Sequence, residues 1–274
     1  MLVYLIAILS GIAFALAGQL TFWPVTTEAP FHFWRPIILL VAGYFIGIGI
    51  AWIFYDISGR LTVSYKKDYR KPTRFARRLL TDGITFINIH AHIKLKKIGL
   101  DKIPNEPFLL IGNHKSKFDP MLVAQVFHKR YIAFITKQDN MKIPLAARFM
   151  WRLGYMPVDR SDKLQSLEQF KKAAELISTG ASSVGVYPEG SRQPADVILA
   201  DFHNGCFNIA IKAKCPIVVL VTKGTEKIHK RFPRKTNVEM KCLQVLYYED
   251  YANMNATELS TYVHDIMYKE LSGE

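Results

Sequence analysis

The chain has 274 residues, of which half are hydrophobic, and its formal net charge at pH 7 is +13. This length fits an α/β domain of about 200 residues together with a smaller accessory segment. The positive charge suits an anionic membrane or phosphorylated substrates; nucleic acid is not an expected partner, because the sequence has no zinc-finger spacing, aromatic RNA-binding signature or long basic arm.

The first 58 residues hold two uncharged apolar runs, 2–23 and 36–55. Each reaches the roughly 20 residues needed to cross the hydrocarbon core of a bilayer. Gly43 and Gly47, with small residues along the first run, would let two helices pack closely. We predict a two-helix membrane hairpin over 1–58, with a hairpin that enters one leaflet only as the alternative. A cleaved signal peptide is disfavoured because no basic segment precedes the apolar run.

A basic cluster follows the second run, and Asp68 is the one acidic residue between positions 61 and 80. By the positive-inside rule, this cluster places a domain over 59–274 on the cytoplasmic face of the cell membrane. Apolar spacing also predicts a helix over 74–87, which either lies on the bilayer surface or presents a solvated face. The basic residues are Arg60, Lys66, Lys67, Arg70, Lys71, Arg74, Arg77 and Arg78.

The rest of the chain alternates between short apolar runs and segments with helical spacing. This alternation predicts an α/β fold with a mixed, largely parallel sheet flanked by helices. Active sites of such sheets lie beyond the carboxyl ends of the strands. The expected strands are 107–113, 130–137, 154–158, 182–187 and 215–222, with a long strand or hairpin in 237–249. The expected helices are 120–129, 142–153, 161–179, 205–214 and 257–272.

Some signatures of chemistry are missing from the sequence. The three cysteines, Cys206, Cys215 and Cys242, lie far apart and form no CxxC pair. We therefore expect reduced cysteines in or near the core, and neither a disulfide framework nor a metal site. The sequence also contains no phosphate-binding loop of the GxxxxGK type.

His114 and Asp119 follow the first of the expected strands. Because Asp is a favoured N-cap and Pro is tolerated at the first helical position, we predict a helix that begins at Pro120 and is capped by Asp119. A loop that folds back would bring the carboxylate onto one imidazole nitrogen and leave the other nitrogen free. His114 is then a candidate general base oriented by Asp119. Taken alone, such a pair is more often a cap or a satisfied polar contact.

Two further polar clusters, 154–160 and 187–192, close the strands at 154–158 and 182–187. If these strand ends converge, Arg160 and Arg192 can hold a phosphate through bidentate hydrogen bonds. Gly190 would let the backbone approach a ligand closely. For each arginine taken alone, a surface ion pair is the commoner explanation. The side chains expected at the common cleft are His114, Arg160, Glu189 and Arg192.

The order and spacing of these clusters resemble the glycerophospholipid acyltransferase family, and in particular its 1-acyl-glycerol-3-phosphate acyltransferases. The resemblance covers about 85–225. The family's second motif, a Gly followed by a short strand and an Arg, matches 154–160. Its third motif, [FY]PEG[TS]R, matches 187–192, and its fourth, an apolar strand opened by Pro, matches 216–219. The first motif, NHxSxxD, matches Asn113, His114, Ser116 and Asp119.

The resemblance implies an O-acyltransferase of phospholipid biosynthesis that works at a membrane without a cofactor or metal. A fatty acyl group would move from a thioester, on coenzyme A or acyl carrier protein, to the free hydroxyl of 1-acyl-glycerol-3-phosphate and give phosphatidic acid. His114 would remove the hydroxyl proton, and Asp119 would orient His114. The residues implied in substrate binding are Asn113, Ser116, Arg160, Glu189, Gly190, Ser191 and Arg192.

The sequence departs from the family pattern at three positions. His203 stands where a lysine is frequent, so a phosphate contact is lost there or supplied by a neighbour such as Lys212. Val219 replaces a second proline of the fourth motif, which would reshape the acyl pocket. Pro157 is a local variation within the second motif.

Other functions are compatible with the same residues. The acceptor could be glycerol 3-phosphate or a lysolipid with a larger head group. A hydrolase could use His114 to activate water, although the sequence has no GxSxG nucleophile elbow. A basic scaffold could bind anionic lipid without chemistry, and it would then tolerate the loss of His114.

Overall fold

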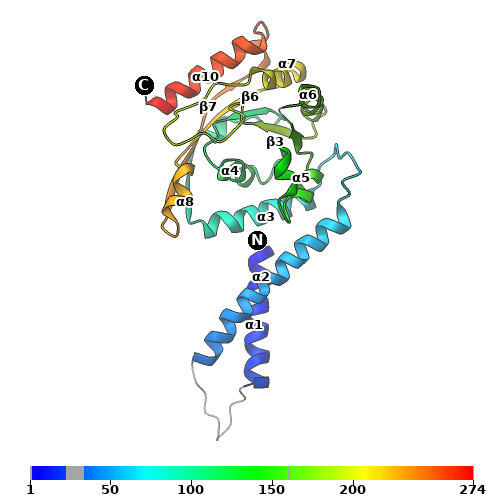
Figure 1. Ribbon diagram of the computed structural model, residues 1–274, viewed down its shortest axis with the longest axis vertical. Helices are drawn as coiled ribbons and strands as arrows, with labels where there is room; N and C mark the ends of the chain where they lie inside the picture. Colours follow the sequence, from blue (N-terminus) through cyan, green and yellow to red (C-terminus); the bar gives the residue numbers. More distant parts are fainter. Residues whose placement is uncertain (1, 23–33, 160, 274) are drawn as a thin grey trace. The chain divides into compact units, whose positions relative to one another are not determined.

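The computed structural model describes residues 2–22, 34–159 and 161–273, and these divide into two compact units, Met1–Ser64 and Tyr65–Glu274. Figure 1 traces both units along the chain. The first unit holds α1 (Leu2–Phe22) and α2 (Trp34–Thr62). The expected domain boundary at residue 58 falls inside α2, which continues four residues further.

The two helices of the first unit pack closely, as the glycine spacing predicts. A Cβ atom added to Gly47 would lie 2.6 Å from Ala7 Cα, and one added to Gly43 would lie 2.8 Å from Gly11 Cα. Glycine is therefore required at both positions for the backbones to approach. By length and composition, both helices could cross a membrane. Their exposed side chains include Leu5, Ile8, Leu9, Ile38, Phe45 and Ile53.

The second unit is built on one seven-stranded sheet with the strand order β1-β7-β6-β2-β5-β3-β4. The strands from β6 to β4 run parallel, β7 is antiparallel to β6, and β1 is parallel to β7. This is the predicted mixed, largely parallel sheet. Because β6, β2 and β5 are parallel neighbours, their carboxyl ends share one edge. The strands are β1 (Ile93–Ile98), β2 (Leu109–Gly112), β3 (Ile132–Lys137), β4 (Met156–Val158), β5 (Ser183–Val186), β6 (Ile217–Lys223) and β7 (Thr236–Leu246).

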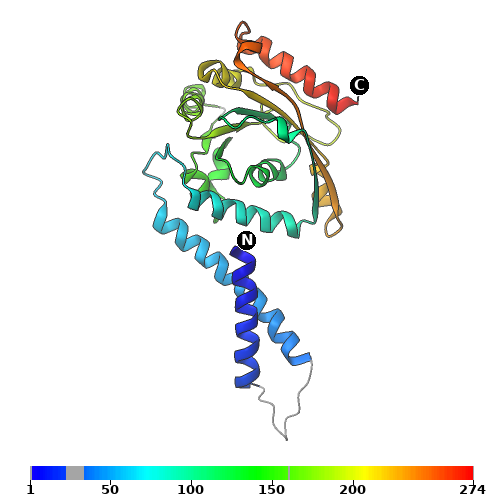
Figure 2. The same ribbon diagram turned by 180° about the vertical axis from the view of Figure 1, so that it is seen from behind.

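Helices cover both faces of the sheet (Figures 1 and 2). The helices α3, α4 and α5 pack together on one face, and α6, α7 and α10 cover the other. The core lies between these layers, where side chains such as Leu110, Ile111 and Val218 are fully buried. The helix bounds are α3 (Arg74–His90), α4 (Phe118–Val126), α5 (Ala147–Arg152), α6 (Lys163–Ser178), α7 (Asn208–Ala213), α8 (Ile228–Arg231), α9 (Tyr248–Tyr251) and α10 (Ala256–Ser272).

The structure differs from the sequence-based expectation at β1 and at the helix expected over 142–153. The strand β1 was not expected, because its apolar residues alternate with lysines and it is only half-buried at the edge of the sheet. The long strand or hairpin expected in 237–249 is confirmed as one long strand, β7, which α9 follows. The helix expected over 142–153 is limited to α5, since a 3₁₀ turn, Gln138–Lys142, precedes it.

Part of the basic cluster that follows α2 is fastened to the second unit. The Trp151 indole N–H donates to Lys67 O at 2.9 Å, and Arg152 donates to Lys71 O at 2.7 Å. Arg70 forms an ion pair with Glu175 of α6. The segment 65–72 is thus held against α5 and α6 by both backbone and side-chain contacts.

Gly185 in β5 leaves space for the Phe134 ring, and its replacement by alanine should destabilise the protein. The added Cβ atom would lie 2.4 Å from Phe134 Cε1. Overpacking of this kind costs about 1–3 kcal/mol of unfolding free energy. Thermal melting in detergent measures the loss. Gly205→Ala is the matched control, because its Cβ would meet Phe170 at an ordinary 3.6 Å and should leave the melting temperature nearly unchanged.

Candidate active site

The loop between β2 and α4 is anchored to the neighbouring strand β6 by Asn113. Its side-chain amide donates to Thr222 O at 3.0 Å, and its side-chain oxygen accepts from Thr222 N at 2.8 Å. These two bonds continue the β2–β6 ladder one step past the end of β2. Asn113 is buried, with 1% of its surface exposed. The amide therefore fixes where the following residue, His114, leaves the sheet.

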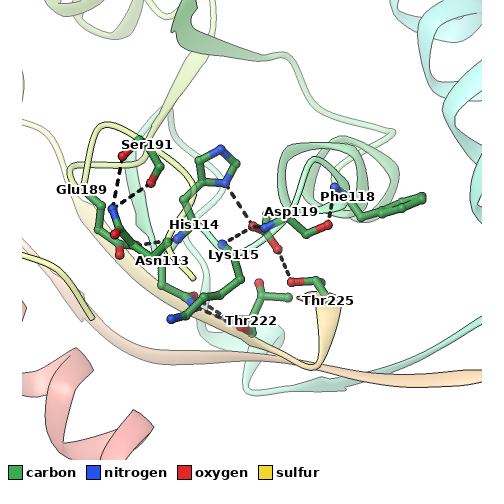
Figure 3. Close-up of polar contacts among 11 residues, drawn as sticks. Asn113, His114, Lys115, Phe118, Asp119, Glu189, Ser191, Thr222 and Thr225 are labelled. Atoms are coloured by element: carbon green, nitrogen blue, oxygen red, sulfur yellow. Dashed lines mark hydrogen bonds and ion pairs between the residues drawn. The ribbon is translucent and has the colours of Figure 1, made fainter. Parts of the chain in front are cut away.

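Asp119 does not cap a helix that begins at Pro120, contrary to the sequence-based prediction. The helix α4 begins at Phe118, and the residue at its N-cap is Lys117, whose side chain makes no capping bond. Asp119 therefore lies inside the first turn and is fully buried. Its carboxylate points back at the loop rather than at the helix terminus (Figure 3).

The Asp119 carboxylate is the centre of the loop's hydrogen-bond network. Both oxygens are occupied, so the carboxylate fixes the loop and the His114 imidazole together. The donors to Oδ2 are His114 Nδ1 at 3.0 Å, Lys115 N at 2.7 Å and Ser116 N at 2.7 Å, and the donor to Oδ1 is Thr225 Oγ1 at 2.6 Å.

His114 is held by three contacts, and one nitrogen of its imidazole is left open. Its Nδ1 faces Asp119, its backbone N–H donates to Glu189 Oε1 at 2.6 Å, and its ring stacks on Tyr187 with centroids 4.6 Å apart. The side chain keeps 19% of its surface exposed. Since Nδ1–H donates a hydrogen bond to the Asp119 carboxylate, Nε2 carries the lone pair, and Figure 3 shows Nε2 on the far side of the ring from Asp119.

Glu189 joins the loop that follows β5 to the His114 loop. Its second oxygen accepts from Ala200 N at 3.2 Å, and only 4% of the residue is exposed. Burial raises the pKa of the Glu189 carboxyl, while hydrogen bonds from the backbone N–H groups of His114 and Ala200 oppose that rise. Like Asn113, Glu189 makes its hydrogen bonds with the chain itself.

The other expected binding residues have different surroundings. Ser116 is buried, and its hydroxyl accepts from the Phe118 backbone. Gly190 has a φ of 74°, in the left-handed region that glycine tolerates. Ser191 and Arg192 are exposed on the same loop, and the Arg192 guanidinium makes no hydrogen bond within the described part of the chain. Arg160 lies outside the described residues.

Three residues of the site were not expected from the sequence. The Thr225 hydroxyl, on the turn after β6, donates a hydrogen bond to Asp119. The Thr222 backbone carbonyl accepts a hydrogen bond from the Asn113 side chain. Lys115 ties the loop 191–200 to the His114 loop, because its ammonium group donates to Pro194 O at 3.2 Å. No motif or spacing marks Thr222 and Thr225, which the strand order brings to the site. Lys115 follows His114 directly, and only its contact with the loop 191–200 was not expected.

Over the residues that the structure describes, no three His, Cys, Asp or Glu side chains gather where they could hold a metal ion. The three cysteines are free and buried, as predicted. The site therefore offers an imidazole with one open nitrogen, a buried carboxylate behind it and an exposed arginine nearby on the adjoining loop.

Known proteins resemble this chain in sequence and fold. A family model described as acyltransferase matches residues 94–223. A 1-acyl-sn-glycerol-3-phosphate acyltransferase of Haemophilus influenzae is 26% identical over 60% of this chain and 68% of its own length. Proteins of the same name from Saccharomyces cerevisiae (25% identical over 50% of this chain) and Brassica napus chloroplasts (32% over 52%) are matched over 45% and 41% of their lengths. The chain thus spans about half the length of most of these relatives.

A solved structure shares the fold. The 1-acyl-sn-glycerophosphate acyltransferase PlsC from Thermotoga maritima superposes with a TM-score of 0.56 at 21% identity, covering 72% of this chain and 77% of that one. The matched family segment contains β2, the His114 loop, the segment 187–192 and β6. From these matches, and from the motifs at 113–119 and 187–192 that the structure brings to one sheet edge, residues 94–223 match an acyltransferase family model and are similar in sequence to 1-acyl-sn-glycerol-3-phosphate acyltransferases.

Proposed function

We propose that this protein acylates the free hydroxyl of 1-acyl-glycerol-3-phosphate with a fatty acyl thioester and forms phosphatidic acid. The observation that carries the proposal is the contact of 3.0 Å between His114 Nδ1 and the fully buried Asp119 carboxylate, with Nε2 left open. The names of the similar enzymes agree with this reaction. Acyl-coenzyme A or acyl carrier protein would be the co-substrate.

His114 acts as the general base in this proposal. Its Nε2 takes the proton of the acceptor hydroxyl while the oxygen attacks the thioester carbonyl carbon. The new C–O bond forms, the C–S bond breaks, and the proton passes from Nε2 to the leaving thiolate. Asp119 holds the imidazole in the tautomer that accepts at Nε2 and stabilises the imidazolium. Asn113, Ser116 and Glu189 then position the loop.

The acceptor phosphate would bind at the loop that carries Ser191 and Arg192, with Arg160 as a further cationic contact. An exposed guanidinium can bind a phosphate oxygen pair without breaking an existing bond. His203, at the position where the family often has lysine, lies against this loop, because its backbone N–H donates to Pro188 O at 2.9 Å. The helices α1 and α2 would anchor the enzyme in the cell membrane, with the second unit on the cytoplasmic side.

A transfer assay with purified protein in detergent tests the proposal. Lysophosphatidic acid, glycerol 3-phosphate and lysolipids with larger head groups are each offered with acyl-coenzyme A and with acyl carrier protein. Formation of phosphatidic acid supports the proposal. Acylation of another acceptor alone would reassign the substrate, free fatty acid without ester would indicate a hydrolase, and no turnover at all would favour the scaffold function.

Thr225→Val should lower the transfer rate without unfolding the protein. The substitution removes the hydroxyl that donates to Asp119 Oδ1 at 2.6 Å and leaves a buried carboxylate oxygen without its partner. Hydrogen bonds to charged groups contribute about 1.5–3 kcal/mol, which corresponds to a loss of roughly 10- to 100-fold in kcat. Thr225→Ser keeps the donor and should retain most of the activity. Equal rates for the two variants would contradict a role for this bond.

Tyr187 should matter through its ring and not through its hydroxyl. The ring stacks on His114, and the buried hydroxyl has no hydrogen-bond partner among the described residues. Burial raises the pKa of the Tyr187 phenol well above its usual value, so it stays neutral. Tyr187→Phe should keep full activity. Tyr187→Leu should lower kcat/KM roughly two- to fivefold, because an aromatic face stabilises the imidazolium by about 0.5–1 kcal/mol.

A further inference from the structure

The segment after β6 exposes a concentration of positive charge. Five of the nine residues from 227 to 235 are Lys or Arg, and all five are exposed. Lys227 approaches Glu226 at 4.0 Å, whereas the other four have no carboxylate within ion-pair distance in the part of the chain that the structure describes. The five residues are Lys227, Lys230, Arg231, Arg234 and Lys235.

Large apolar side chains are exposed beside these cations. Phe232 is 62% exposed, and Ile87 and Ile89 at the end of α3 are 48% and 47% exposed. His92 joins the two segments, since its ring lies 6.4 Å from the Phe232 ring. Figures 1 and 2 both show α8 beside the C-terminal end of α3. We refer to Ile87, Ile89, Phe232 and the five cations as the cationic corner.

Lipid and an acidic carrier protein are the two surfaces that such a corner could meet. Both surfaces are negatively charged and attract the cations, so the choice between them depends on the exposed apolar side chains. Exposed aromatic and aliphatic side chains within a field of Lys and Arg are typical of segments that lie in the interface of an anionic bilayer. The chain also holds two helices apolar enough to cross a membrane. The mixed character of the corner therefore favours lipid.

The cationic corner is connected to the active site through one short segment. Thr225, which donates to Asp119, lies two residues before Lys227. The His229 ring lies 5.4 Å from the ring of Phe118, the first residue of α4. A contact made by this corner would thus bring the lipid surface close to the turn of the chain that supports the His114–Asp119 pair.

We propose that the cationic corner docks the second unit onto anionic lipid, independently of the two apolar helices. Phe232, Ile87 and Ile89 enter the head-group region, and the five cations face the lipid phosphates. The contact depends on anionic lipid and on ionic strength, because charges separated by more than the Debye length, about 8 Å at physiological salt, are largely screened. Lipid docking by the cationic corner does not depend on the proposed transfer reaction, because it follows from the position and charge of these side chains.

Site-directed labelling of the full chain in vesicles tests this contact. The three native cysteines are buried, so Phe232→Cys and Ile89→Cys can each carry an environment-sensitive nitrobenzoxadiazole label. Leu167→Cys on α6, at a site 50% exposed, is the matched control. In phosphatidylcholine vesicles containing phosphatidylglycerol, labels at 232 and 89 should shift to the blue and be quenched by lipid-borne quenchers, and the label at 167 should not. Salt at ~1 M, where the Debye length is about 3 Å, should reverse the effect.

Charge-reversal variants provide a second test of the lipid contact. Lys230→Glu with Arg234→Glu in the Phe232→Cys chain should abolish most of the quenching, because each cation near anionic lipid contributes roughly fivefold to the attraction. Lys129→Glu with Lys171→Glu changes the net charge equally and should leave the quenching intact. A label at 232 that stays in water on anionic vesicles overturns the proposal. A label that responds to acyl carrier protein and not to lipid would also overturn it and assign the corner to that protein.

Discussion

Replacing His114 with alanine should almost abolish acyl transfer while the protein remains folded and bound to membranes. Among the described residues of the site, the imidazole is the one group with an open nitrogen backed by a buried carboxylate. Removal of a general base costs on the order of 10²–10⁴-fold in rate. The measurement is the initial rate of phosphatidic acid formation in detergent, together with co-sedimentation of the variant with vesicles.

His128→Ala is the matched control for this experiment. His128 is an exposed histidine whose ring contacts only the Gln125 carbonyl at 3.1 Å among the described residues. Its loss should leave the rate unchanged. If His114→Ala kept the wild-type rate of phosphatidic acid formation, His114 would not be the general base, and the proposed mechanism would be wrong. If the variant lost release of free fatty acid rather than ester formation, the hydrolase would be supported.

Much of the sheet could be predicted because its central strands are short runs of apolar residues between polar loops. Leu109, Leu110 and Ile111 have no exposed surface, and buried parallel strands read as continuous hydrophobic segments. The edge strand β1 could not be predicted in the same way. Its alternating lysines face solvent at the border of the sheet, and so short an alternating run is equally compatible with a surface loop.

The pairing of His114 with Asp119 could be predicted, but the geometry behind it could not. An Asp–Pro pair ordinarily indicates a helix cap. Here α4 begins at Phe118, one residue before Asp119, and the carboxylate turns inward to collect donors from the loop. Local preferences describe only neighbours in sequence. They cannot show that a buried aspartate will accept hydrogen bonds from the backbone of a loop instead of from a helix terminus.

Thr225 illustrates contacts that only the tertiary fold supplies. It lies 106 residues from Asp119 in the chain, and it also falls beyond the segment matched by the family model. The parallel register of β2 and β6 brings the two residues together, since Gly112 is paired with Leu220 just before the two loops diverge. Strand order within a sheet cannot be read from the periodicity of one sequence, so this contact became visible only in the structure.

Asp119→Asn should be nearly as damaging as the loss of His114. The carboxylate accepts four hydrogen bonds, whereas an asparagine offers one accepting oxygen and an NH₂ group that must face donors. If the NH₂ faces His114 Nδ1, the imidazole must carry its proton on Nε2 and can no longer act as a base. If the oxygen faces it, the imidazolium still lacks its counter-charge. We expect a loss on the order of 10²–10⁴-fold in kcat.

A double variant separates this mechanism from simple damage to the loop. If Asp119 acts through His114, then His114→Ala with Asp119→Asn should be no slower than His114→Ala alone, because groups that act as one unit are not additive. Asp196→Asn, at an exposed carboxylate, should behave as wild type. Losses that multiply in the double variant would mean that Asp119 contributes independently of the imidazole, and the base assigned to His114 would then require another orienting group.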